Sequence, residues 1–188
     1  MSKLTNFVGF QLCWFACVLG AARGHEWAGP LSVALFLGWA LLRVARPARE
    51  LAALALAAGL GTVVDTLQLQ MGWLAYAGTP IAGALAPAWI VALWVVFAMT
   101  FDSSLAWLAR RRAWFAAFGA VGAPFSYWGG ARLGAVTFGE PLWPSVLGIS
   151  VCWGLALPLA SWAVERLRGG AGERLRGGAG EREGTPAS

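Results

Sequence analysis

Charged residues are scarce in this chain of 188 residues, at 12% of the total, whereas hydrophobic residues make up 59%. Soluble domains carry about a quarter charged residues, so the few present here could not cover an aqueous surface. The apolar residues fall in successive runs of about 20 residues, and each run is long enough to cross a bilayer as a helix. We therefore predict an all-α, polytopic membrane protein that is surrounded by the lipid bilayer.

Histidine and cysteine are also rare, with one and three residues. A single histidine rules out a multi-histidine metal site, and the chain contains no GxSxG, HExxH, Walker or paired CxxC motif. Cys13, Cys17 and Cys152 all lie within apolar runs, where a thiol behaves as a small hydrophobe. We expect no metal, no cofactor and no disulfide.

Six apolar runs predict six transmembrane helices, over residues 6–22, 27–44, 50–71, 87–108, 113–136 and 143–164. The first run follows Lys3 and ends in small residues, as a signal peptide would, but its aromatic residues and Gln11 favour a retained helix. The connection 72–86 is uncharged and rich in glycine and proline. We expect it to lie flat at the outer interface or to dip into it as a re-entrant segment.

The basic residues predict the orientation of the helices, because Lys and Arg in short loops stay in the cytoplasm. Alternate connections collect twelve basic residues on one side and two, Arg23 and Arg132, on the other. The twelve are Lys3, Arg43, Arg46, Arg49, Arg110, Arg111, Arg112, Arg166, Arg168, Arg174, Arg176 and Arg182. Both ends are therefore predicted to be cytoplasmic. Since the basic residues cluster at the ends of apolar runs, a nucleic-acid partner is not expected.

The last 24 residues differ in character from the rest. The segment 165–172 is repeated residue for residue as 173–180, and it is rich in glycine and charge. Such a segment buries too little apolar surface to offset the entropy of ordering. We predict a disordered cytoplasmic tail over residues 165–188.

Polar side chains inside apolar runs are costly in lipid, so they are the first candidates for a functional site. Asp65 lies in the outer half of the third run, with Gln68 at helical spacing from it. Arg132, at a similar depth on the fifth run, is its expected partner, and Tyr127 lies one turn away. Asp65 could form a structural ion pair, contact a ligand, or carry ions or protons. If the two residues do not meet, Arg132 extends to the headgroups.

Small residues recur every four positions on the fifth run, at Gly122, Ser126, Gly130 and Gly134. Such a ridge allows another helix to approach closely, so we predict helix packing there. Pro124 in the same run is expected to kink the helix.

A second polar group, Thr100 to Ser104, lies near the inner end of the fourth run. A serine with a general base can be imagined there, but His25 is predicted to lie on the other side of the membrane. Capping and charge balance are the favoured interpretation.

The segment 119–136, which contains Ser126-Tyr127-Trp128-Gly129-Gly130-Ala131-Arg132-Leu133-Gly134, resembles a bacterial inner-membrane family catalogued as domain of unknown function 2878. The segments Ser104 to Leu108 and Gly9 to Trp14 resemble it too, and the similarity extends over about residues 5–164. This resemblance implies a location in the bacterial inner membrane, and no particular activity.

The leading hypothesis is a protein that binds or transports a small or lipid-like molecule in an outward-facing cavity containing Asp65, Gln68, Tyr127 and Arg132. A membrane-embedded lipid-modifying enzyme is a second possibility, which the shortage of nucleophile and base pairs disfavours. The third is a scaffold or assembly subunit, or a homo-oligomer, which would dock through the small-residue ridge.

Overall fold

A computed structural model describes residues 1–169 of the chain. It is mostly helical over this range, with α1 (Lys3–Ala22), α2 (Ala28–Leu41), α3 (Pro47–Gln70), α4 (Ala88–Ala98), α5 (Ala106–Ala109), α6 (Arg112–Arg132) and α7 (Leu142–Gly169). Four short strands lie in the connections, namely β1 (Leu74–Tyr76), β2 (Pro80–Ile81), β3 (Leu85–Pro87) and β4 (Val136–Phe138). A helix therefore lies within each of the six apolar runs.

The surface of the helix bundle is apolar. Helices α1, α3 and α7 are each long and apolar enough to cross a membrane, and α2 and α4 are apolar but shorter. Large apolar side chains such as Leu4, Leu35, Phe125 and Leu155 are about 70% exposed on the outside of the bundle. Exposed apolar surface of this extent fits contact with lipid rather than with water.

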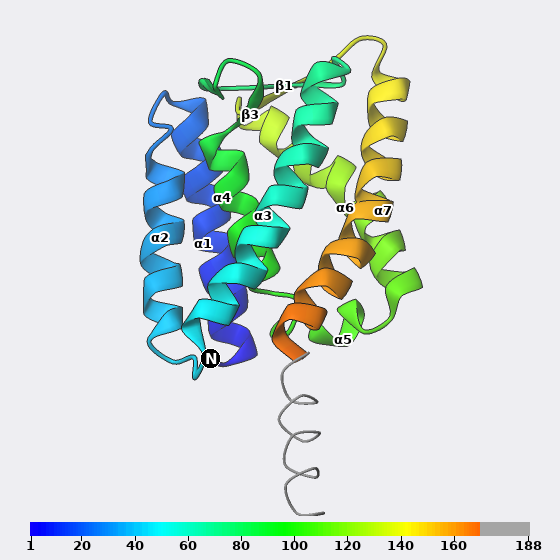
Figure 1. The fold of residues 1–188 in the computed structure, drawn as a ribbon. Coiled ribbons are helices and arrows are strands. Elements are labelled where there is room, and N and C mark those ends of the chain that lie inside the picture. The colour runs from blue at the N-terminus through cyan, green and yellow to red at the C-terminus, as the bar shows by residue number, and fades with distance from the viewer. Residues whose placement is uncertain (170–188) are drawn as a thin grey trace, which may run out of the picture.

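Helix α4 forms the centre of the bundle. It packs against α1, α2 and α3, while α7 packs against α3 and α6. Its side chains Trp89, Trp94 and Val96 are almost completely buried. The bundle thus has α1 and α2 on one side of α4, and α6 and α7 on the other (Figure 1).

The two ends of the bundle differ. The N-terminus, the α2–α3 turn, α5 and the end of α7 lie together at one end, which we call the arginine-rich end (Figure 1). The strands lie at the opposite end, which we call the strand end (Figure 1). Twelve basic residues are predicted to be cytoplasmic. Those that fall within residues 1–169 belong to the arginine-rich end.

Two small antiparallel sheets lie at the strand end and add to the predicted helices. Strand β1 pairs with β4, and β2 pairs with β3. Gly72 and Gly78 have φ values of 68° and 97°, which allow the chain to turn before and after β1. Glu26, in the α1–α2 turn, accepts a hydrogen bond from the Thr79 backbone N–H at 2.7 Å. The three connections at this end are therefore tied to one another.

The predicted fourth helix, 87–108, is broken in the structure. Helix α4 ends at Ala98, turns follow, and α5 contains only Ala106–Ala109. The buried side chain of Asn6 on α1 donates to the Met99 carbonyl at 3.0 Å and accepts from the Ser104 hydroxyl at 2.7 Å. Because Asn6 takes a carbonyl that the next helical turn would use, it stabilises the break.

The last two helices also differ from the predicted ranges. Helix α6 ends at Arg132 instead of residue 136, because Gly134 has a φ of 88° and the Ala135 N–H bonds back to the Gly130 carbonyl. Helix α7 continues to Gly169, so the first five residues of the predicted tail are helical. The rest of that prediction, residues 170–188, lies outside the described residues.

Candidate functional site

Asp65 on α3 is completely buried and accepts three hydrogen bonds from uncharged donors. Its Oδ1 accepts from the hydroxyl of Tyr76, at 2.7 Å, and from the hydroxyl of Tyr127. Its Oδ2 accepts from Nε1 of Trp94 at 2.5 Å. Within residues 1–169, no Lys or Arg side chain forms a salt bridge with Asp65. The carboxyl group is therefore well hydrogen-bonded but has no cationic partner.

The three donors come from three different elements. Tyr76 lies on β1, Trp94 on α4 and Tyr127 on α6. Asp65 thus joins the centre of the bundle, one of its sides and the sheet at the strand end through one carboxyl group. Because a buried carboxyl group is costly without hydrogen bonds, the positions of the four elements depend on one another.

Gly61, one turn before Asp65 on the same helix, makes room for Trp94. A Cβ atom at residue 61 would lie 2.0 Å from the Trp94 indole, a distance that no side chain can tolerate. The missing side chain lets the indole lie against α3, where its Nε1 reaches Asp65. Gly61 is therefore a positioning residue for this hydrogen bond.

Trp153 on α7 completes an aromatic cluster around the carboxyl group. Its ring stacks on Trp94 with centroids 4.4 Å apart, and the Tyr127 ring meets it edge-on at 6.0 Å. Its Nε1 is buried without a hydrogen-bond acceptor in the described part of the chain.

A cavity of about 420 Å³ adjoins this cluster. Its walls come mainly from α1, α4 and α6, with Asp65 from α3 and Trp153 from α7 at one side. The lining residues Phe7 and Phe15 on α1 and Phe118 on α6 are 41 to 51% exposed on the bundle surface. The cavity therefore opens sideways between α1 and α6, and its volume is in the usual range for small-molecule sites.

Most of the cavity wall is aromatic or aliphatic. Ten aromatic side chains contribute, namely Phe7, Phe10, Trp14, Phe15, Trp89, Trp94, Phe97, Phe118, Tyr127 and Trp153. Asp65 is the one acidic residue in the lining, which contains no Lys, Arg or His. The cavity thus combines an apolar wall with a single group that can carry negative charge.

The predicted site residues are only partly brought together. Tyr127 meets Asp65 directly, and both line the cavity. Gln68 is completely buried, but it is not part of the lining, and its Oε1 has no partner in residues 1–169. Arg132 is exposed, with its guanidinium 6.0 Å from the Trp128 ring. The expected ion pair of Asp65 with Arg132 is wrong, because the two phenols and the indole occupy the carboxyl group.

The small-residue ridge of α6 faces the cavity instead of a neighbouring helix. Gly122, Ser126 and Gly130 all line the cavity, and Gly134 lies beyond the end of the helix. A Cβ atom at Gly122 would meet only the Phe118 ring, at 3.9 Å. The close approach of α7 occurs at Gly119, where a Cβ atom would lie 2.5 Å from the Trp153 carbonyl oxygen. The ridge therefore creates space for the cavity.

The second polar group belongs to the arginine-rich end. Arg168 on α7 donates to both carboxylate oxygens of Glu50 and lies 3.1 Å from Asp102. This arrangement joins α7, α3 and the turn after α4. It balances charge, as the sequence suggested, and within residues 1–169 no group of three His, Cys, Asp or Glu side chains could hold a metal ion.

Sequence reasoning missed Tyr76, Trp94 and Trp153. Tyr76 lies in the predicted connection 72–86, and the sequence pattern does not single out either tryptophan. One signal was available, because the chain has twelve tryptophans but only two tyrosines, and both tyrosines bind Asp65. A rare amphipathic residue within an apolar chain is a candidate partner for a buried carboxyl group.

Comparison with known proteins gives one match. A family model described as "Protein of unknown function (DUF2878)" matches residues 3–159. No curated protein and no solved structure matches the chain. The matched range includes every residue of the Asp65 cluster and the whole cavity lining.

Proposed function

The chain belongs to the family of proteins of unknown function DUF2878, and we propose that it is a multi-pass membrane protein whose cavity binds a small or lipid-like molecule. In this proposal it crosses a bacterial inner membrane six times, with both ends in the cytoplasm. The molecule enters the cavity from the bilayer and is held there or passed across the membrane.

The distribution of charge supports the orientation. The α2–α3 and α5–α6 connections, which hold most of the arginines of the connections, lie at one end of the bundle together with the end of α7, whereas Arg23 and Arg132 belong to the other end (Figure 1). Basic connections remain cytoplasmic during insertion. The strand end would then face outward. The bilayer location itself is supported by the apolar surface of the bundle and by the three long apolar helices.

The fourth crossing needs more than one helix. Helix α4 has 11 residues, which corresponds to about half the thickness of the hydrocarbon core. The turns after Ala98 and helix α5 would complete the crossing. Irregular backbone is tolerated at membrane depth where protein surrounds it, and Thr100 and Phe101 in these turns are buried.

The cavity is the observation that carries the proposed function. It has a volume of about 420 Å³, an aromatic wall and an opening between α1 and α6. Its opening lies on the lipid-facing side of the bundle, so an apolar molecule could enter without crossing water. A wall built from small residues on one helix and large rings on the others favours a binding site over a packed interface.

Retention of a bound molecule tests this proposal. The full chain is purified from cell membranes in a mild neutral detergent, and native mass spectrometry measures any molecule that it keeps. Gly122→Leu adds a side chain at a residue of the cavity lining, where the Cβ atom itself meets only the Phe118 ring at 3.9 Å. Gly59→Leu is the matched control, because residue 59 is exposed on α3 with open space around it.

We expect a molecule bound to the wild type and to Gly59→Leu, and its loss from Gly122→Leu. Equal retention by all three chains would place the molecule elsewhere and overturn the proposal. So would the absence of any retained molecule together with no binding of added amphiphiles.

Labelling of single cysteines tests the topology. The three native cysteines are first replaced, and one cysteine is then introduced either in the Arg110–Arg112 turn or in the connection 72–86. A membrane-impermeant reagent added to intact cells should label only the second position. Labelling of both positions from the same side would refute the proposed crossings.

A further inference from the structure

We propose that the ligand of this cavity is an amphiphilic organic cation, a protonated or quaternary amine with an apolar chain. This inference rests on the proposed function, because it names the chemical class of molecule that the same cavity accepts. The amine lies among the aromatic rings beside Asp65, and the apolar chain extends between α1 and α6.

The charge of the cavity wall is the first step. Asp65 is the only acidic residue of the lining, and the lining has no basic side chain. The three acidic groups that form salt bridges within residues 1–169 are Glu50, Asp102 and Glu165, all at the arginine-rich end. The charge of an ionised Asp65 would therefore be balanced by no side chain of the described protein.

The hydrogen bonds around Asp65 leave it suited to a cationic ligand. Trp94 can only donate, and the two phenols also point their oxygens at the carboxyl group. Neutral donors stabilise a carboxylate without cancelling its charge. A cation in the adjoining cavity would supply the missing charge in a region of low dielectric constant, where such attraction is strong.

The rings next to Asp65 provide a surface that cations favour. Trp94, Trp153 and Tyr127 lie against one another at one side of the cavity. The faces of indole and phenol rings attract ammonium groups, and tryptophan does so most strongly. Trp94 and Tyr127 also donate to the carboxyl group, which polarises them and strengthens this attraction. An amine here needs no direct contact with the Asp65 oxygens.

The rest of the cavity selects for an apolar chain. Beyond the Asp65 cluster the wall is formed mainly by rings from α1 and α4, and the lining side chains Phe15 and Phe118 are partly exposed on the bundle surface. A fatty acid or a phosphate headgroup would face Asp65 with no basic residue to pair with. The cavity wall therefore favours a ligand with a positive headgroup over one with a negative or an uncharged headgroup.

Three ligands with the same eight-carbon chain and headgroups of different charge provide the test. Octyltrimethylammonium, octyl sulfate and 1-octanol are titrated by calorimetry into the full chain in dodecyl maltoside, whose headgroup is uncharged. Micelles without protein give the blank. The chains compared are the wild type, Asp65→Asn, Gly122→Leu and the control Gly59→Leu, each checked for folding by circular dichroism and size-exclusion chromatography.

We expect the ammonium ligand to bind the wild type at least about tenfold more tightly than either other ligand, as one strong cation–π site and a nearby charge would give. Asp65→Asn should reduce this preference to about twofold or less. Gly122→Leu should weaken binding of every ligand, and Gly59→Leu should change none. If Asp65→Asn does not fold, the comparison of the three ligands on the wild type still decides.

The experiment distinguishes a failure of the cation inference from a failure of the proposed function. Octanol binding that Gly122→Leu weakens, with no preference for the ammonium ligand, would overturn the cation inference and keep the proposed function. Tightest binding of octyl sulfate would also overturn the inference. Binding of none of the three ligands beyond the blank, or equal binding by Gly122→Leu, would overturn the proposed function as well.

Discussion

At the arginine-rich end, Glu50 and Asp102 share the guanidinium of Arg168, whereas near the strand end Asp65 accepts only from phenols and an indole. In the first cluster both carboxylates have a cationic partner, and the cluster links three segments of the chain. The second, Asp65, is equally well hydrogen-bonded but has no cationic partner within residues 1–169, and it borders a cavity. The difference fits a structural role for the first carboxylates and, under the proposed function, a ligand-binding role for Asp65.

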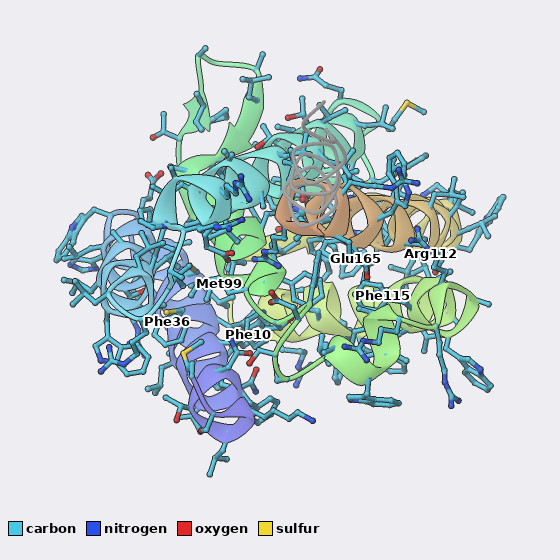
Figure 2. All side chains as sticks on the ribbon, turned by 60° about the horizontal axis from the view of Figure 1, so that its bottom comes forward. Phe10, Phe36, Met99, Arg112, Phe115 and Glu165 are labelled. Carbon is cyan, nitrogen blue, oxygen red and sulfur yellow. The ribbon has the colours of Figure 1, made fainter. Side chains whose placement is uncertain are left out.

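The two regions also differ in how their helices meet: glycines make space near Asp65, and ion pairs join the helices at the arginine-rich end. Near Asp65, Gly61 admits an indole and Gly122 leaves an open space. At the opposite end, Arg112 and Glu165 are paired across α6 and α7 at the surface, where their side chains are half exposed (Figure 2).

Removal of the buried carboxyl group should have the largest effect on stability. Asp65→Ala leaves two phenol hydroxyls and one indole N–H without their acceptor, and we expect it to lower the free energy of unfolding by about 3 kcal/mol. Asp65→Asn retains an acceptor and should cost less. Unfolding in mixed dodecyl maltoside and dodecyl sulfate micelles measures both. A cost for Asp65→Ala no greater than that for Asp65→Asn would mean that the three hydrogen bonds contribute little.

A methyl group at Gly61 should have the next largest effect. Gly61→Ala forces the Trp94 indole away from α3, and overpacking of this kind costs about 2 kcal/mol. Gly59→Ala, two residues earlier on the same helix, meets open space and should stabilise the helix by up to about 1 kcal/mol. Opposite signs of the two changes in the same unfolding measurement are expected. A stabilising effect at both positions would show that Trp94 does not depend on Gly61.

The ion pairs of the arginine-rich end should contribute unequally to stability, because they differ in burial. Arg168→Gln removes a guanidinium whose side chain is 17% exposed, and we expect a loss of about 1.5 kcal/mol. Arg112→Gln breaks a pair in which both side chains are 50% exposed, so its effect should be about 0.3 kcal/mol. Neither change should alter binding of octyltrimethylammonium. Equal losses for the two variants would argue against a structural role for the Glu50 and Asp102 cluster.

Substitution of Arg132 should have the smallest effect on ligand binding and stability. Because its guanidinium lies beside Trp128 on the surface, Arg132→Ala should change ligand binding by less than about twofold and stability by about 0.5 kcal/mol. The same calorimetric titration measures the first quantity. A large loss of binding would restore the pairing of Arg132 with Asp65 that the sequence suggested.

Part of the site could be found from the sequence because lipid makes polar side chains conspicuous. Asp65 and Tyr127 stand out among apolar neighbours, and both line the cavity. Their partners could not be found in this way. Trp94 and Tyr76 lie 29 and 11 residues from Asp65 along the chain, and nothing local distinguishes a tryptophan that donates to a carboxyl group from one that packs in the core.

The sequence by itself determined the mostly helical, apolar character of the chain and the positions of its apolar runs, because both follow from local composition and from the length of helix that spans a bilayer. Only the tertiary structure decided where the fourth run breaks, which donors reach Asp65 and on which side the α6 ridge lies. These features depend on contacts between distant residues, such as Asn6 with Met99 and Gly61 with Trp94. Local sequence patterns do not predict such contacts.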